Sequence, residues 1–366
     1  MNATEQTSQA STETKIKSES KNKIRVDFER TSLITRLRIR FLSVFFLKNV
    51  IWIIIRLVLL VGVSFIVLRP FFVKISGSVF SPQDFLDSTV KLIPRNPTFG
   101  TYYAIIIEND YFKALFSTAI LSLISGLMQM LICTLVGYGF AKFRFRFNNM
   151  IFGLVIFTLI IPHQTLYFSM SMKFRFFDFL NIYETIQKFL GVTKASEWKI
   201  NFMNSSVAGI EGLLWPVVIL SLTGLAFKNG LYVLIMRQFF RGFPDELEEA
   251  SYVDGSGVFR TYLTVILPNA IPMMITVFLF AFTWQWTDEF YVGMFTTDKG
   301  PYLLPRILDQ IPLSLTRSSE AIQAGVMYTS AINNTMGLLI IAPLILVYIV
   351  GQNFLIQGIE RTGVTG

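Results

Sequence analysis

Apolar residues occur along this chain in long runs, and shorter polar stretches separate them. Six runs with few charged side chains lie at about residues 50–69, 115–140, 151–170, 213–237, 271–290 and 336–352. A helix of about 20 residues is long enough to cross the hydrocarbon core of a bilayer. The pattern therefore predicts an all-α membrane protein with six transmembrane helices.

The polar stretch between the fourth and fifth runs has the pattern of two helices separated by a break. It carries five acidic residues and two arginines, which cannot lie in hydrocarbon. Four acids follow Pro244 within one turn, and acids in this position favour a helix start. The glycine-rich residues 255–257 then interrupt this helix. A second short helix is expected over residues 258–267, ended by Pro268 and Pro272.

The composition is that of a membrane protein. Of 366 residues, 52% are hydrophobic and 15% are charged, and the net charge is +8. The basic residues flank the apolar runs instead of gathering with aromatic residues in one patch, which indicates membrane orientation and argues against nucleic acid as a partner. With one cysteine and one histidine, neither an intramolecular disulfide nor a metal centre is expected.

The distribution of basic residues predicts the topology. Residues 1–48 form a basic arm, of which residues 1–23 are expected to be disordered. Residues 142–146 hold three bases and no acid in a very short loop, and short basic loops lie on the cytoplasmic side. No cleavable signal peptide is evident. With six spans, both termini and the central polar stretch are cytoplasmic in a multi-pass protein.

The central stretch resembles the EAA motif of bacterial ABC importer permeases. The resemblance lies in Glu249-Ala250-Ser251, then Asp254-Gly255-Ser256, then Leu267-Pro268 and Pro272. This sequence has Ser251 and Ser256 where alanine is usual in the family, and Tyr262 where phenylalanine is common. The family resemblance implies a type I ABC importer permease fold, with residues 240–270 forming a coupling loop whose helix docks on a cytoplasmic ATPase subunit.

Further segments resemble the carbohydrate-uptake branch of that family, in the subfamily of the second maltose-type permease. They are residues 111–116, 138–143, 237–240 and 352–354. The resemblance implies a transmembrane domain over residues 49–366 in the bacterial cytoplasmic membrane. It also implies four kinds of partner: a second homologous permease, two ABC ATPase subunits, an extracytoplasmic solute-binding protein and a carbohydrate substrate. The outer segment 173–211 looks longer than is usual in the family.

The resemblance also implies which residues couple the chain to the ATPase. They are Glu249, Ala250, Ser251, Asp254, Gly255, Ser256 and Pro268. Glu249 is expected to make a charge-assisted contact with the ATPase. The alternative is that Glu249 is an acid on a helix that contacts only solvent. Gly255 is expected to permit a turn that a side chain would obstruct.

No catalytic constellation is visible in the sequence. There is no Walker A glycine loop, so ATP and Mg²⁺ are expected on partner subunits and no cofactor on this chain. The residues Pro162-His163 indicate a kink better than a catalytic site. The chain is therefore expected to be a transport subunit and not an enzyme.

Lys228 is the charge placed deepest in a predicted span. It lies nine residues before Arg237, which is about 13 Å along a helix at 1.5 Å per residue. Ionisable groups at that depth face a bundle interior or a water-filled path. With Asn229 and Gly230 beside it, Lys228 suggests an unwound stretch that lines the solute route. Snorkelling or a structural ion pair is an equal alternative.

Residues 284–289 resemble the family's W-N-D/E-F signature, with Thr287 replacing asparagine. Trp284 and Trp286 offer faces on which a sugar ring stacks, and Asp288 offers a polar group for hydroxyls. Tryptophan also anchors helices at membrane interfaces, which explains the same residues without a substrate. Four further polar residues are candidates for the substrate path: Gln129, Gln164, Asn333 and Asn334. Each is better explained by bonding between helices than by binding solute.

Other functions fit the sequence less well. Within the importer class, the solute is alternatively a polyol, a glycerophospho compound or a peptide. From another class, the alternative is a membrane scaffold or an intramembrane enzyme without transport activity. The absence of paired catalytic residues and the presence of a docking motif argue against that class.

Overall fold

The computed structural model describes residues 44–177, 202–203, 213–296, 303–307 and 310–363. The chain divides into two compact units, Met1–Pro70 and Phe71–Gly366. The predicted disorder of residues 1–23 and most of the outer segment 173–211 lie outside the described residues.

The first unit contributes most of α3, Val44–Gly77. The stretch Lys48–Gly77 is long and apolar enough to cross a membrane. None of the side chains described for residues 48–69 is buried. The first apolar run is therefore a helix whose surface suits contact with lipid or with other apolar helices.

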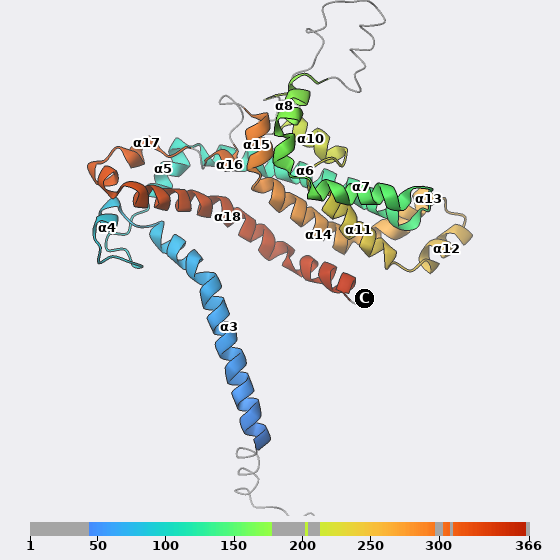
Figure 1. The fold of residues 1–366 in the computed structure, drawn as a ribbon, viewed down its shortest axis with the longest axis horizontal. Coiled ribbons are helices and arrows are strands. Elements are labelled where there is room, and N and C mark those ends of the chain that lie inside the picture. Colours follow the sequence, from blue (N-terminus) through green and yellow to red (C-terminus); the bar gives the residue numbers. More distant parts are fainter. Residues whose placement is uncertain (1–43, 178–201, 204–212, 297–302, 308–309, 364–366) are drawn as a thin grey trace, which may run out of the picture. The chain divides into compact units, whose positions relative to one another are not determined.

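The second unit is built around α6, Tyr111–Lys142 (Figure 1). Helices α11, Asn229–Arg241, and α14, Leu267–Trp286, pack along it. One apolar core joins these three helices through side chains such as Tyr138, Met236 and Val277. The close approach of α6 to α11 depends on Gly137, because a Cβ added to this glycine would lie 2.6 Å from Cβ of Met236.

The remaining elements of the second unit are short helices and one long C-terminal helix. They are α4 Pro82–Leu86, α5 Gly100–Glu108, α7 Asn148–Ile160, η1 His163–Leu166, α8 Tyr167–Arg175, α10 Trp215–Leu222, α12 Glu246–Val253, α13 Val258–Thr261, η5 Tyr262–Ile266, α15 Glu289–Phe295, α16 Leu304–Ile307, α17 Leu313–Thr316 and α18 Ser319–Gly363. The predicted all-α class is confirmed for the described residues.

Four described helices are long and apolar enough to cross a membrane, and a bent pair brings the number to five. This differs from the six predicted spans. The fourth predicted span, residues 213–237, is divided between α10 and α11, with residues 223–228 outside both helices. Gly224, with φ of +74°, lies in that interruption.

The third predicted span, residues 151–170, is a bent pair instead of one straight helix. Helix α7 ends at Ile160, and the segment His163–Arg175 continues at 92° to it. Pro162 precedes the turn, so the predicted kink is confirmed. The ring of His163 packs against the rings of Phe227 and Phe290, with centroids 4.9 and 5.0 Å away.

The expectation that Pro268 and Pro272 end a short helix was wrong. Helical structure continues from Val258 to Trp286. Residues Tyr262–Ile266 form a π-helical turn, in which the N–H of Leu267 donates to the carbonyl of Tyr262. This wider turn lies directly before Pro268, where a proline ring conflicts with regular α-helical bonding. The fifth span therefore begins well before residue 271.

The sixth predicted span, residues 336–352, was too short. Helix α18 begins at Ser319, and the apolar helix extends to Ile356. Gly325 has φ of +55° and ψ of −130°, so it marks a kink between two helical parts. Residues 319–335, which precede the sixth predicted span, are therefore already helical.

Candidate functional site

Helix α12 and the turn after it form the predicted coupling element. The helix ends in a Schellman motif: the N–H of Gly255 donates to the carbonyl of Tyr252, and that of Ser256 donates to the carbonyl of Ser251, both at 3.0 Å. Gly255 has φ of +82°, a conformation that side chains disfavour. No atom lies within 4 Å of a Cβ added there. The glycine is therefore needed for its backbone angle and not for space, and this angle agrees with the expectation of a turn that a side chain would hinder.

A hydrogen bond closes the hairpin between α12 and α13. The hydroxyls of Ser251 and Thr261 are 2.9 Å apart, and both residues are buried. Buried hydroxyls need a partner, so each residue satisfies the other. This bond fixes the angle at which α12 leaves the longer helix.

Charged groups anchor α12 to the end of α6. The ammonium of Lys142 forms an ion pair with Asp245 and a second one, of 3.3 Å, with Glu248. The hydroxyl of Tyr138 lies 3.3 Å from Oε2 of Glu248, and Lys142 also donates to the carbonyl of Phe243 at 2.9 Å. The hydrogen bond and the charge of Lys142 hold the pKa of Asp245 below its usual value.

This anchor was not predicted from the sequence. Glu248 is one of several acids at a helix start, and Lys142 was expected to contribute only to membrane orientation. The available signal was the spacing of Glu248 and Ser251, which lie three residues apart on one helical face. Both are buried, unlike the acids beside them.

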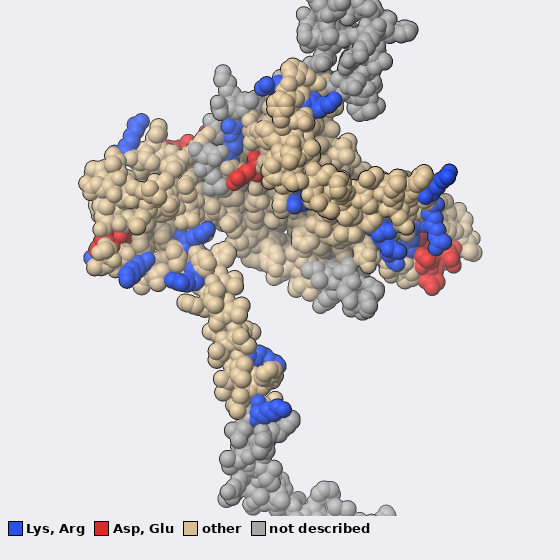
Figure 2. All heavy atoms as spheres, viewed as in Figure 1, with Lys and Arg blue, Asp and Glu red and all other residues tan. Residues whose placement is uncertain are grey.

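The predicted coupling residues divide into an outer and an inner set. Glu249, Ala250 and Asp254 are exposed, whereas Ser251 faces inward. Ser256 is half-buried, and Pro268 is exposed in the first turn of α14. Figure 2 shows acidic and basic side chains gathered at the end of the second unit that carries α12 and the α6–α7 loop. The outer set is therefore available to a partner.

A second feature brings two predicted substrate-path residues together. Nζ of Lys228 lies 4.0 Å from the centre of the Trp284 ring, which is a cation–π contact. Both residues line a hollow of about 430 Å³ between α11, α14 and α18, with Tyr232, Thr283 and Thr287 in its wall. No ion pair joins Lys228 to a carboxylate in the part of the chain that the structure describes. That result argues against the structural ion pair considered for Lys228.

The other predicted path residues lie elsewhere. Trp286 is buried and donates from Nε1 to the carbonyl of Ile340 at 3.0 Å. Asp288 is buried and caps α15, accepting from the N–H of Tyr291 at 3.2 Å. Asn229 is buried next to Lys228, and its side-chain atoms have no hydrogen-bond partner among the described residues. Gln164 is exposed in η1. None of these four lines the hollow.

The role expected of Gln129 is confirmed. Nε2 of Gln129, on α6, donates to the hydroxyl of Ser221, on α10, at 3.3 Å, and both residues are buried. The bond joins two helices, as we expected for this glutamine.

Comparison with known proteins decides the family. Residues 133–361 match the model of the binding-protein-dependent transport system inner membrane component. This match covers more than half of the chain. The chain belongs to this family.

Related proteins agree with this assignment. The permease is 26% identical over 300 residues to the putative ABC transporter permease protein ORF2 of Caldicellulosiruptor sp., a match covering 81% of this chain and 91% of the relative. It is 22% identical over 296 residues to the probable starch degradation products transport system permease protein AmyC of Thermoanaerobacterium thermosulfurigenes. This match covers 81% of this chain and 91% of the relative.

The fold is also that of a solved importer. The structure matches a chain of a bacterial ABC transporter involved in the import of the acidic polysaccharide alginate, with a TM-score of 0.59 and 18% identity. The match covers 84% of this permease and 97% of that chain. The permease is thus a membrane-embedded transport subunit of an ABC importer and not itself an enzyme. The family in general works with a partner permease, an ATPase and a binding protein.

Proposed function

We propose that this permease carries a carbohydrate, either a sugar or an oligosaccharide, across the bacterial cytoplasmic membrane by ATP-driven alternating access. It works beside a second homologous permease and receives solute from an extracytoplasmic binding protein. The observation that carries the proposal is the contact between Lys228 and Trp284 in a hollow of about 430 Å³. The name of the relative that transports starch degradation products supports the same class of solute.

The hollow has the surface chemistry that a carbohydrate needs. Trp284 is 48% exposed, which leaves apolar surface for the C–H face of a sugar. Thr283, Thr287 and Lys228 also line the hollow, and their hydroxyl and ammonium groups are of the kind that exchange hydrogen bonds with sugar hydroxyls.

Helix α12 transmits the driving force. In the proposed arrangement both termini and α12 are cytoplasmic, and Mg²⁺ and ATP bind two separate ATPase subunits. Closure of those subunits displaces the docked α12, and the anchor from Glu248 to Lys142 passes the displacement to α6. Because α11 and α14 flank the loop and pack on α6, the three helices move together.

Uptake into proteoliposomes tests the proposal. The full complex with its binding protein is expected to take up a labelled oligosaccharide only when ATP is supplied inside. Loss of the Trp284 ring in Trp284→Ala is expected to reduce uptake about tenfold at low solute. Lys228→Met should also reduce it, whereas Phe116→Ala, which removes an exposed ring on α6 outside the hollow, should not.

Two results would overturn parts of the proposal separately. Unchanged uptake by both Trp284→Ala and Lys228→Met would remove the hollow from the solute path. ATP-dependent uptake of a polyol, a glycerophospho compound or a peptide, but of no saccharide, would replace the proposed solute class.

A further inference from the structure

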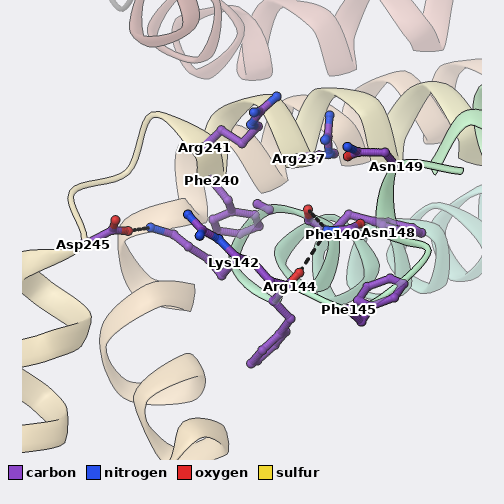
Figure 3. Close-up of a pocket in the computed structure, with 12 residues that line it drawn as sticks. Phe140, Lys142, Arg144, Phe145, Asn148, Asn149, Arg237, Phe240, Arg241 and Asp245 are labelled. Atoms are coloured by element: carbon purple, nitrogen blue, oxygen red, sulfur yellow. Dashed lines mark hydrogen bonds and ion pairs between the residues drawn. The ribbon is translucent and has the colours of Figure 1, made fainter. Parts of the chain in front are cut away.

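A basic pocket lies between the α6–α7 loop and the end of α11, apart from the solute hollow. It has a volume of about 440 Å³. Four cationic side chains and one carboxylate line it: Lys142, Arg144, Arg237, Arg241 and Asp245 (Figure 3). The coupling anchor uses Lys142 and Asp245, which pair with each other. None of the three guanidinium groups forms an ion pair with the anchor, although the charge of Arg144 also helps to lower the pKa of Asp245.

These guanidinium groups are free to bind an anion. None of them forms an ion pair with a carboxylate of a described residue. Arg237 and Arg241 lie one helical turn apart and leave α11 on the same side, beside Asn149 (Figure 3). Cζ of Arg237 lies 3.9 Å from the centre of the Phe152 ring, a cation–π contact that restrains the guanidinium group. Repulsion among three such groups falls when an anion with several oxygens enters between them.

The wall of the pocket is preformed. Nδ2 of Asn148 donates to the carbonyls of Phe140 and Phe143, at 3.4 and 3.0 Å, which holds the α6–α7 loop in place (Figure 3). The loop also presents Phe143, Phe145 and Phe147 as exposed rings beside its bases. Apolar rings next to cations are typical of the boundary between hydrocarbon and water.

We propose that this pocket binds the phosphate group of an anionic phospholipid of the inner leaflet. Arginine forks match phosphate oxygens in a bidentate manner. Basic pockets between membrane helices on the cytoplasmic side bind anionic lipid head groups. Free inorganic phosphate has the same chemistry, so the test separates the two sources. The inference depends on the proposed function only for the side of the membrane, and not on the solute.

Lipid binding to the purified complex, measured by native mass spectrometry, tests this site. Wild-type protein is titrated with phosphatidylglycerol, with phosphatidylcholine, and with phosphatidylglycerol in the presence of excess inorganic phosphate. Arg144→Gln with Arg241→Gln removes two exposed charges from the pocket and should weaken phosphatidylglycerol binding about 30-fold. The matched control, Lys173→Gln with Arg175→Gln, removes two exposed charges on α8 and should have no such effect.

The outcomes are distinct. Loss of phosphatidylglycerol binding only in the pocket variant supports the site, and resistance to inorganic phosphate assigns it to the lipid. Displacement by inorganic phosphate supports a phosphate site filled from solution and overturns the lipid assignment. Equal phosphatidylglycerol binding by pocket variant and control overturns the proposal. So does loss of the ATPase subunit from the pocket variant while lipid binding is unchanged, because the pocket then serves the partner protein. If the double variant is unstable, Arg237→Gln provides a second variant, which removes one charge and should weaken phosphatidylglycerol binding about fivefold.

Discussion

Lys142 and Glu248 form a buried ion pair: Nζ of Lys142 lies 3.3 Å from Oε1 of Glu248, and each side chain is 10% exposed. Lys142 ends α6, the central helix of the second unit, and Glu248 lies in α12. The pair therefore joins α12, the predicted coupling helix, to the core of the bundle.

Removal of the cation from this pair should destabilise the protein. In Lys142→Met, the carboxylate of Glu248 stays buried without a counter-charge, and such a break costs about 3 kcal/mol. Thermal unfolding of the purified complex measures the loss. Asp245→Asn is the control, because Asp245 is 77% exposed and solvent can replace its partner. Combining Lys142→Met with Glu248→Gln should restore part of the stability. Equal effects of Lys142→Met and the control would contradict a buried pair.

The same substitution at two neighbouring glycines should have unequal effects. Gly255→Ser places a side chain on a residue with φ of +82°, at a cost of roughly 1–2 kcal/mol. Gly257→Ser falls at φ of −76°, in a helix-capping position that serine favours. Unfolding midpoints and co-purification of the ATPase with each variant compare them. Equal loss in both variants would show that the backbone angle is not the constraint.

The hydroxyl pair in the hairpin should behave as a unit. Ser251→Ala leaves the hydroxyl of Thr261 buried without its partner, and the expected loss is about 1 kcal/mol. Adding Thr261→Val removes the unpaired hydroxyl and should recover most of that loss. A double-mutant cycle on unfolding free energies measures the coupling. Simple additivity of the two substitutions would exclude the bond.

Packing of α6 on α11 should depend on one glycine. A Cβ in Gly137→Ala would meet Cβ of Met236 at 2.6 Å and the backbone nitrogen of Arg237 at 3.0 Å, so the helices must separate at a cost of about 1–3 kcal/mol. Gly139→Ala is the control, since nothing lies within 4 Å of its added Cβ. The unfolding midpoint should fall only for Gly137→Ala. An equal fall in the unfolding midpoint of Gly139→Ala would show that a change from glycine to alanine in α6 lowers stability by itself, without the contact with Met236.

Local signals in the sequence predicted much of this fold. The helical class, the hairpin of α12 and α13 and the break at Gly255 follow from hydropathy, helix-start acids and glycine placement. The prolines were misread because the π-helical turn at Tyr262–Ile266, which accommodates Pro268, has no simple composition signal. The fourth span was predicted as one helix because the residues on both sides of the interruption at 223–228 are apolar, so hydropathy does not reveal the break.

The candidate sites depend on contacts between distant parts of the chain. The hydroxyl of Tyr138 contacts Glu248, which lies 110 residues later in the sequence, and a hydrophobic pattern cannot predict a contact between residues so far apart. Lys228 and Trp284 were each selected for their residue type and depth, but only the packing of α11 against α14 brings them together. Trp286 and Asp288 match the same signature and yet serve the core and a helix cap.

Cross-linking of α12 to the ATPase tests the central claim most directly. The natural cysteine, Cys133, is buried, so a cysteine introduced at exposed Ala250 is the reactive one. In the assembled complex, Ala250→Cys should cross-link to the ATPase subunit, and the yield should change when ATP binds. Tyr103→Cys, at an exposed position on α5, should give no such product. Absence of the ATPase product from Ala250→Cys, or an equal yield from Tyr103→Cys, would contradict the role of α12 in coupling.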